Sequence, residues 1–267
     1  MTKDRNADKA NYYQSQIGIL RWMVELVRVD IIMEIFMLSS FLTSPRECHL
    51  EAVFHIYAYL EKKHNSRMVF DPMYPEIDMT VFKECDWKDF YGNVKEVLPP
   101  NAPLPRGKEI DLRIYVDLDH ASDHSNRRSR TGFFVFINMA PIIWYSKKQP
   151  TVETSVFGAK FFAMKKGIKN TRGLRYKLRM MGVPLDGPTY TYGDNISVIH
   201  NTQRPDSTLK KKSNSICYHV FRESVAVGNT ITGHVPTLEN LADLATKVIP
   251  GGIKSNSLIE RILYDIA

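Results

Sequence analysis

The order of apolar patterns after residue 110 constrains the fold of this chain more than any other feature of the sequence. Leu112, Ile114 and Val116 alternate with other residues at the two-residue period of a β-strand. Five runs have strand character: residues 112–117, 131–138, 141–146, 190–192 and 230–235. Four stretches have helical character: residues 152–181, 195–201, 213–227 and 239–248. This order, with three strands before the first helix, predicts an α/β domain built on one mixed five-stranded sheet.

The first 63 residues have a different pattern, which predicts helices alone. Apolar side chains recur every three or four residues over 15–44, as on one face of a helix. Pro45 ends that pattern and suits the first turn of a second helix, which we expect to run to Lys63. The two helices are expected to form an antiparallel helical pair that precedes the sheet.

Residues 64–109 separate the two patterns. Prolines recur through this stretch, most densely over 98–105, and they prevent a regular helix or strand. We therefore expect a helical segment at 1–63, a Pro-rich linker at 64–109, the sheet domain at 110–250 and a helical tail at 251–267.

Charge and cysteine content narrow the class of protein. The 267 residues carry a formal net charge of +7, and 43% are hydrophobic, which is enough to bury a core. A basic balance favours a polyanionic partner, most commonly nucleic acid. Three cysteines without C-x-x-C spacing argue against a disulfide framework or a zinc site. Charged residues interrupt the most apolar stretch, 17–42, so we expect no membrane span. The polar residues 1–16 lack the apolar core of a signal peptide, so we expect no secretion signal.

Three aspartates stand at or within predicted elements of the sheet domain. Asp117 ends the first strand, Asp194 follows the fourth, and Asp243 lies in the last helix. Carboxylates that converge from separate elements are the ligands that Mg²⁺ prefers, and two ions can clamp the attacking and leaving oxygens of a phosphodiester. Aspartates can also occur at such positions because they are solvated at the surface. Their positions alone therefore indicate a metal site but do not establish one.

Five short sequence motifs occur in this region. They are YVDLDHASD at 115–123, RRSRTG at 127–132, WYSKKQPT at 144–151, YGDN at 192–195 and LADLATK at 241–247. In this order and spacing they resemble the ribonuclease H domain of copia-type retrotransposons, over residues 110–250. Three upstream motifs resemble the segment that joins reverse transcriptase to ribonuclease H in the same elements: QIG at 16–18, RVDI at 28–31 and HLEAVF at 49–54.

The resemblance implies a ribonuclease H-like fold and metal-dependent hydrolysis of RNA in RNA–DNA hybrids. It assigns Asp117, Asp194 and Asp243 as ligands of Mg²⁺, with two ions as one arrangement and Mn²⁺ as a substitute. The implied partners are an RNA–DNA hybrid and the reverse transcriptase palm that would precede this segment in the polyprotein. The implied location is an intracellular one, in a cytoplasmic particle or in the nucleus.

One position departs from the family's pattern. The family has a fourth carboxylate, a glutamate in the long helix, and the matching position here is Lys160. An ammonium group cannot ligate Mg²⁺ and repels it. Glu153 lies seven residues earlier, ~10 Å along a helix axis, and is too distant to replace it. The resemblance therefore implies that this copy hydrolyses RNA in RNA–DNA hybrids poorly.

Further residues are candidates for proton transfer and for nucleic-acid contact. His234 precedes Asp243 at the place where some ribonucleases H have a proton-handling histidine, although an ordinary polar residue that ends a strand is the favoured explanation. Two basic runs are candidates for contact with a hybrid backbone: Arg127, Arg128 and Arg130, and Lys210, Lys211 and Lys212. A charged run can also merely face solvent.

Two other functions remain open from the sequence. A non-catalytic remnant of the same element that binds nucleic acid is consistent with Lys160. A fragment of a reverse transcriptase palm is a weaker alternative, because the palm motif needs adjacent aspartates and Leu118 separates Asp117 from Asp119 here.

Overall fold

The computed structural model describes residues 3–121, 123, 127–209 and 212–265. The chain forms two compact units, which we treat separately. Unit one contains Met1–Val69 and Lys247–Ala267, and unit two contains Phe70–Thr246. These units do not follow the segments expected from the sequence, because most of the 64–109 segment belongs to unit two and the C-terminal segment belongs with the N-terminal helices.

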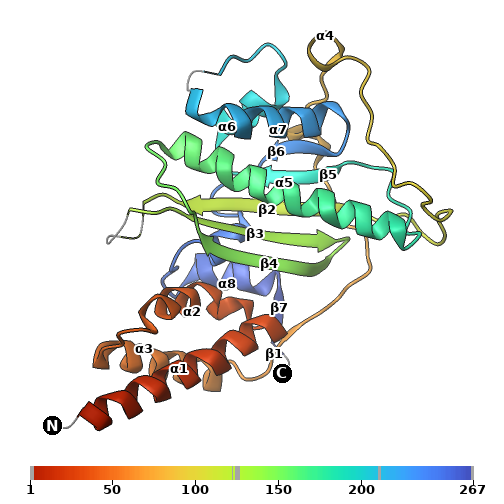
Figure 1. Cartoon of the computed structure of the whole chain (residues 1–267). Helices are drawn as coiled ribbons and strands as arrows, with labels where there is room; N and C mark the ends of the chain where they lie inside the picture. Colours follow the sequence, from red (N-terminus) through yellow and green to blue (C-terminus); the bar gives the residue numbers. More distant parts are fainter. Residues whose placement is uncertain (1–2, 122, 124–126, 210–211, 266–267) are drawn as a thin grey trace. The chain divides into compact units, whose positions relative to one another are not determined.

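Unit two is built on a mixed five-stranded sheet in the order β4-β3-β2-β5-β6 (Figure 1). The strands are β2 (Leu112–Asp119), β3 (Arg130–Ile137), β4 (Ala140–Lys148), β5 (Thr189–Gly193) and β6 (Thr230–His234). β2, β3 and β4 are antiparallel neighbours, whereas β5 is parallel to β2 and β6 is parallel to β5. The α/β class and the mixed five-stranded sheet expected from the sequence are confirmed.

Helices and a short 3-10 segment complete unit two. They are α5 (Val156–Met180), α6 (Ile196–Gln203), α7 (Ser215–Ala226) and the 3-10 helix η5 (Leu241–Ala245). Helix α5 lies close to β2, since a Cβ atom added at Gly167 would come within 2.9 Å of Ile114 Cδ1. Segment η5 lies close to β3, since a Cβ at Gly132 would come within 2.6 Å of Thr246 Cγ2. The helix expected at 239–248 is therefore a shorter 3-10 segment, packed closely on the sheet.

The core of unit two is apolar and continuous. Strands β2 and β3 contribute alternating side chains, and α5, α6 and α7 contribute the residues that face them; the fully buried members include Leu112, Ile114, Phe133, Val135, Phe161, Ile168, Val198 and Phe221. A domain of this size gains most of its stability from such burial.

The Pro-rich segment is largely packed on unit two. It contains the short 3-10 helix η3 (Met79–Val81) and the helix α4 (Lys88–Tyr91). Phe82 forms an isolated antiparallel bridge with Gly233 on β6. Glu96 forms ion pairs with Arg175 at 2.8 Å and Arg179 at 2.6 Å, both on α5. Most of the expected linker is thus held by specific contacts although it contains little regular structure.

Unit one consists of helices and a two-stranded sheet. The elements are α1 (Lys3–Leu26), η1 (Val29–Ile31), α2 (Ile32–Leu38), η2 (Ser39–Phe41), α3 (Glu47–Lys62), β1 (Ser66–Met68), α8 (Ile253–Glu260) and β7 (Leu263–Asp265). The expected single helix over 15–44 is wrong, because the chain leaves helical geometry at Val27, where φ is 146°, and at Arg28. The expected helical tail contains α8, but it ends in a strand that pairs antiparallel with β1. Among the described residues, no helix is long and apolar enough to span a membrane.

Candidate functional site

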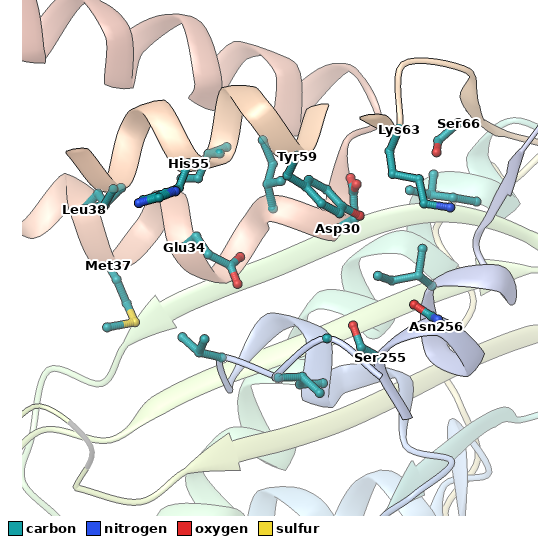
Figure 2. A pocket seen from close by; sticks show the side chains of 18 of the residues that line it. Asp30, Glu34, Met37, Leu38, His55, Tyr59, Lys63, Ser66, Ser255 and Asn256 are labelled. Atoms are coloured by element: carbon teal, nitrogen blue, oxygen red, sulfur yellow. The ribbon is translucent and has the colours of Figure 1, made fainter. Parts of the chain in front are cut away.

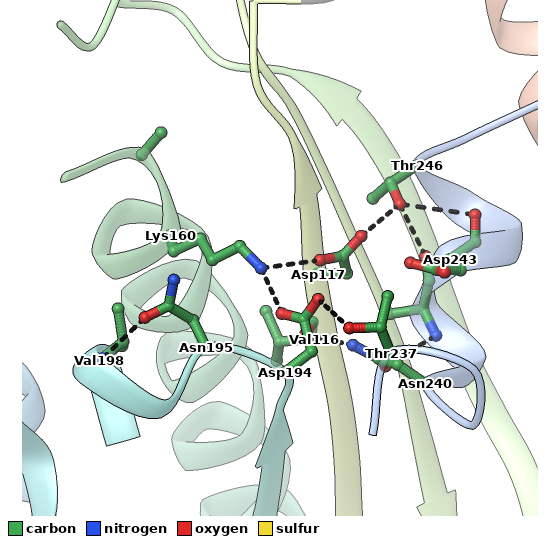
Figure 3. A network of polar contacts seen from close by, with 12 residues as sticks. Val116, Asp117, Lys160, Asp194, Asn195, Val198, Thr237, Asn240, Asp243 and Thr246 are labelled. Carbon is green, nitrogen blue, oxygen red and sulfur yellow. Dashed lines mark hydrogen bonds and ion pairs between the residues drawn. The ribbon is translucent and has the colours of Figure 1, made fainter. Parts of the chain in front are cut away.

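Asp117, Lys160 and Asp194 meet at one end of the central strands (Figure 3). Asp117 lies near the end of β2, and Asp194 directly follows β5, the parallel neighbour of β2. Lys160 lies in the first turns of α5, after Ser155, whose hydroxyl caps the helix by accepting from Gly158 N at 3.2 Å. The Lys160 ammonium lies 3.5 Å from Asp117 Oδ1 and donates a hydrogen bond to Asp194 Oδ1.

This ion-pair cluster is shielded from solvent. The side chains of Lys160, Asp117 and Asp194 are 15%, 0% and 7% exposed. A buried charge is costly unless it is paired and hydrogen-bonded, so the single ammonium offsets much of the repulsion between the two carboxylates. The cluster is stabilised without any metal ion.

Segment η5 holds the second oxygen of Asp117. The Thr246 hydroxyl donates to Asp117 Oδ2 at 2.8 Å. Asn240 fixes the start of the segment: its side-chain amide donates to Val116 O at 3.1 Å, and its oxygen accepts from Ala242 N at 3.2 Å. The close approach permitted by Gly132 thus brings a hydroxyl donor to the buried carboxylate.

Asp194 and Asp243 are held by their own local structure. Thr237 Oγ1 lies 3.5 Å from Asp194 Oδ2, and Asn195 begins α6 by accepting from Val198 N at 3.0 Å. Asp243 is completely buried within η5 and is drawn beside Thr246 in Figure 3. The three aspartates named from the sequence therefore belong to elements that converge on one end of the sheet.

The arrangement does not fit a Mg²⁺ ion as it stands. Mg²⁺ demands an octahedral shell of oxygens at ~2.0–2.1 Å, and the Lys160 ammonium takes the space between Asp117 and Asp194. The cavity that these residues line measures about 10 Å³, room for about one water molecule. In the part of the chain that the structure describes, no three His, Cys, Asp or Glu side chains form a group that could hold a metal ion.

His234 and Glu153 flank this centre. His234 ends β6 and pairs in register with Gly193, the residue before Asp194. A Cβ added at Gly158 would lie 3.0 Å from Glu153 Oε2, so this carboxylate lies against the first turn of α5. It does not line the small cavity between the aspartates. Glu153 therefore does not take the place of the fourth carboxylate.

The proposed nucleic-acid contacts have different surroundings. Arg127 and Arg128 are exposed beside β3, and Lys212 is exposed at the start of the 3-10 helix η4 (Lys212–Asn214). Lys210 and Lys211 lie outside the described residues. Arg130 differs from the expectation, because its side chain is buried and donates to Ser146 Oγ at 3.1 Å. Burial lowers the pKa of Arg130, although nearby Asp119 and Asp123 act in the opposite direction. The Arg130 side chain therefore packs within the sheet.

Sequence reasoning missed two residues of the centre, Thr246 and Asn240. Thr246 lies within the LADLATK motif and Asn240 directly precedes it, so the motif marked the place. A threonine and an asparagine in a short segment carry no periodic signal, and their roles depend on the close packing of η5 against the sheet.

Comparisons with known proteins show that the chain is similar in sequence to retrotransposon polyproteins. It is 26% identical over 235 residues to the "Retrovirus-related Pol polyprotein from transposon RE1" of Arabidopsis thaliana, a match that covers 88% of the chain and 14% of that protein. It is 30% identical over 166 residues to the corresponding polyprotein from transposon RE2 of the same plant, covering 60% of the chain and 11% of that protein. The chain thus spans less than a sixth of these relatives. No family model matches it.

A solved structure gives a weaker likeness. The N-terminal RNase H domain of rv2228c from Mycobacterium tuberculosis superimposes with a TM-score of 0.40 at 11% identity, covering 52% of the chain and 91% of that chain.

Proposed function

We propose that the chain is part of a Pol polyprotein of a copia-type retrotransposon and carries a ribonuclease H-type domain whose metal site is replaced by an ion pair. The observation that carries this proposal is the Lys160 ammonium between Asp117 and Asp194. The sheet order and the converging aspartates support the domain type.

Loss of the metal site has a direct chemical consequence. Hydrolysis of a phosphodiester by this class of site depends on bound cations to stabilise the developing negative charge. Here Lys160 supplies one positive charge, but it is fixed by two carboxylates and cannot coordinate a phosphate oxygen and a water together. We therefore propose that hybrid cleavage by this copy is lower by orders of magnitude and that binding of the RNA–DNA hybrid remains.

Exposed basic residues support the binding part of this proposal. Arg127 and Arg128 lie on the segment between β2 and β3, and β2 carries Asp117. Lys212 is the described member of the second basic run, and the contribution of Lys210 and Lys211 stays a prediction. Arginine and lysine contacts to phosphates supply most of the sequence-independent affinity for nucleic acid. Recognition of a hybrid fits this chemistry because it depends on backbone shape and the 2′-hydroxyl groups.

Reverting the lysine tests the proposal. Lys160→Glu removes the ammonium and adds a carboxylate among Asp117, Asp194 and Asp243. We expect Mg²⁺ to raise the melting temperature of this variant, because an ion that binds only the folded state stabilises it, and to leave that of the wild-type protein nearly unchanged. Cleavage of a labelled RNA–DNA hybrid should rise in the same variant, measured with Mg²⁺ and with Mn²⁺.

A matched control separates the site from general charge effects. Lys169 is exposed on the same helix, so Lys169→Glu makes the same charge change away from the aspartates. It should show neither a metal-dependent melting temperature nor a gain in cleavage. Efficient Mg²⁺-dependent cleavage by the wild-type protein, unimproved by Lys160→Glu, would falsify the proposal.

The palm alternative receives no support from the geometry. A polymerase palm presents adjacent aspartates at a hairpin turn. Asp117 and Asp119 both lie within β2, with Leu118 between them, and their register partners on β3 are Gly132 and Arg130. The non-catalytic alternative, a remnant that binds nucleic acid, is retained in the part of the proposal that concerns hybrid binding.

A further inference from the structure

Unit one contains a cavity that the proposed function does not use. It has a volume of about 640 Å³ and lies between α2, α3 and the C-terminal segment with α8 (Figure 2). Most of its lining is apolar and includes Ile31, Met37, Leu38, Ile56, Ile259 and Leu263. Small-molecule sites typically measure ~300–1,000 Å³ and combine an apolar lining with a few polar groups.

One of the acidic residues in the lining is already compensated by the protein. The Asp30 carboxylate accepts from the Arg28 guanidinium at 2.7 and 3.0 Å, and its side chain is completely buried. Burial and the charge of Asp30 raise the pKa of the neighbouring Tyr59 hydroxyl. Asp30 therefore has no need of an external cation.

Glu34 lies one turn further along the chain and differs from Asp30. It is partly buried, and Figure 2 shows its carboxylate directed into the cavity. Burial raises the pKa of Glu34 and the charge of Asp30 raises it further, while its own backbone N–H acts in the opposite direction. Among the described residues, no basic side chain forms an ion pair with it. A carboxylate in apolar surroundings without a cation is a costly arrangement that a bound cation would relieve.

We propose that this cavity binds an apolar organic cation, a small molecule whose single protonated amine pairs with Glu34 while its hydrocarbon body fills the space lined by α2, α3 and α8. The volume and apolar lining select a compact hydrocarbon body, and the uncompensated carboxylate selects the positive charge. Lys63 also belongs to the lining and lies beyond Tyr59 in Figure 2, so the amine is placed at the Glu34 end.

Three probes of one shape test the charge preference. Adamantanamine, adamantanol and adamantane carboxylate share a rigid hydrocarbon body and differ in charge. Isothermal titration calorimetry on the full chain should give the tightest binding for the amine, at least about tenfold tighter than the alcohol, with the carboxylate weakest. Glu34→Gln should bring the amine down to the affinity of the alcohol.

Two further variants separate the site from general effects. Glu51→Gln changes an exposed carboxylate on α3 and should leave the preference for the amine intact. Ala52→Phe fills the cavity from α3 and should abolish binding of the amine and the alcohol, with folding checked by circular dichroism. Equal affinity for the amine and the alcohol, or no heat with any probe, overturns the proposal. The proposal is also overturned if the protein is a dimer that Ala52→Phe dissociates, because the cavity would then be part of an interface between two copies of the chain.

Discussion

A lysine between two buried carboxylates is part of the stability of this fold. Removing one partner of a buried charge cluster leaves the others uncompensated, which typically costs about 3–5 kcal/mol. The Lys160 ammonium compensates Asp117 and Asp194 together, and the Asp117 side chain is completely buried. A neutral side chain at position 160 is therefore expected to destabilise the fold, although a lysine there does not suit catalysis.

Lys160→Met should therefore destabilise the protein. Methionine has a similar volume and no charge, so the expected loss of about 3–5 kcal/mol in the free energy of unfolding reflects the missing ammonium. Urea denaturation at neutral pH measures it. Lys169→Met, an exposed change on the same helix, should stay within about 0.5 kcal/mol of the wild type. Equal stability of Lys160→Met and the wild type would show that the two aspartates do not need this cation.

Some residues of the candidate centre could be predicted and others could not. Asp117 and Asp194 follow from the alternation that locates the ends of two strands, and Lys160 follows from its place in a family motif. Thr246 could not be predicted, because its hydrogen bond to Asp117 spans 129 positions in the sequence. The prediction that Arg130 contacts a hybrid backbone is wrong. A basic run predicts exposed side chains, whereas the position of Arg130 on β3 buries its side chain.

At the scale of elements, Glu96 joins the Pro-rich segment to α5 through ion pairs with Arg175 and Arg179. Arg175 is almost completely buried, and its guanidinium donates to both Glu96 oxygens, at 3.1 and 2.8 Å. Burial alone would raise the pKa of Glu96, but Arg175 and Arg179 outweigh it and lower the pKa below its ordinary value of 4.5. A lowered pKa in the folded state means that ionised Glu96 stabilises the protein above pH 4.5, and that this contribution is lost as the pH falls below that value.

Glu96→Gln should remove this pH-dependent contribution. We expect the variant to be less stable than the wild type by about 2 kcal/mol at pH 7, because Arg175 loses its charged partner. The difference should shrink as the pH falls below 4.5, the ordinary value for the carboxyl group. Thermal unfolding from pH 3 to pH 7 tests this, with the exposed Glu84→Gln as a control that shows no such trend. A difference independent of pH would contradict the assigned ion pair.

Elements were predictable where local pattern and tertiary packing agree. The alternation of Leu112, Ile114 and Val116 matches a strand whose side chains are buried on both faces. The break at Val27 was not predictable, because apolar spacing continues through it from Val24 to Ile31 while the backbone turns to pack η1 and α2. Proline content predicted little regular structure in the 64–109 segment, which contains only β1, η3 and α4, but it carried no information on the long-range ion pairs of the segment.

At the scale of the whole molecule, the net charge is consistent with the proposed polyanionic partner. A net charge of +7 attracts any polyanion, and only its distribution distinguishes a binding face from general solvation. The exposed arginines on the segment between β2 and β3 place positive charge next to the strand that bears Asp117. If that segment contacts phosphates, its charges affect the salt dependence of binding more than equal charges elsewhere.

Replacement of Arg127 and Arg128 by glutamine should therefore weaken hybrid binding and reduce its dependence on salt. Each phosphate contact adds about 0.7–0.9 to the magnitude of the slope of log affinity against log salt concentration, so losing two should lower that magnitude by about 1.4–1.8. Fluorescence anisotropy with a labelled RNA–DNA hybrid over a range of salt concentrations measures the slope. Lys169→Gln combined with Lys177→Gln removes the same charge from exposed positions on α5 and should leave the slope nearly unchanged. If both pairs lower the slope equally, the attraction comes from net charge, and the segment between β2 and β3 is not a binding face.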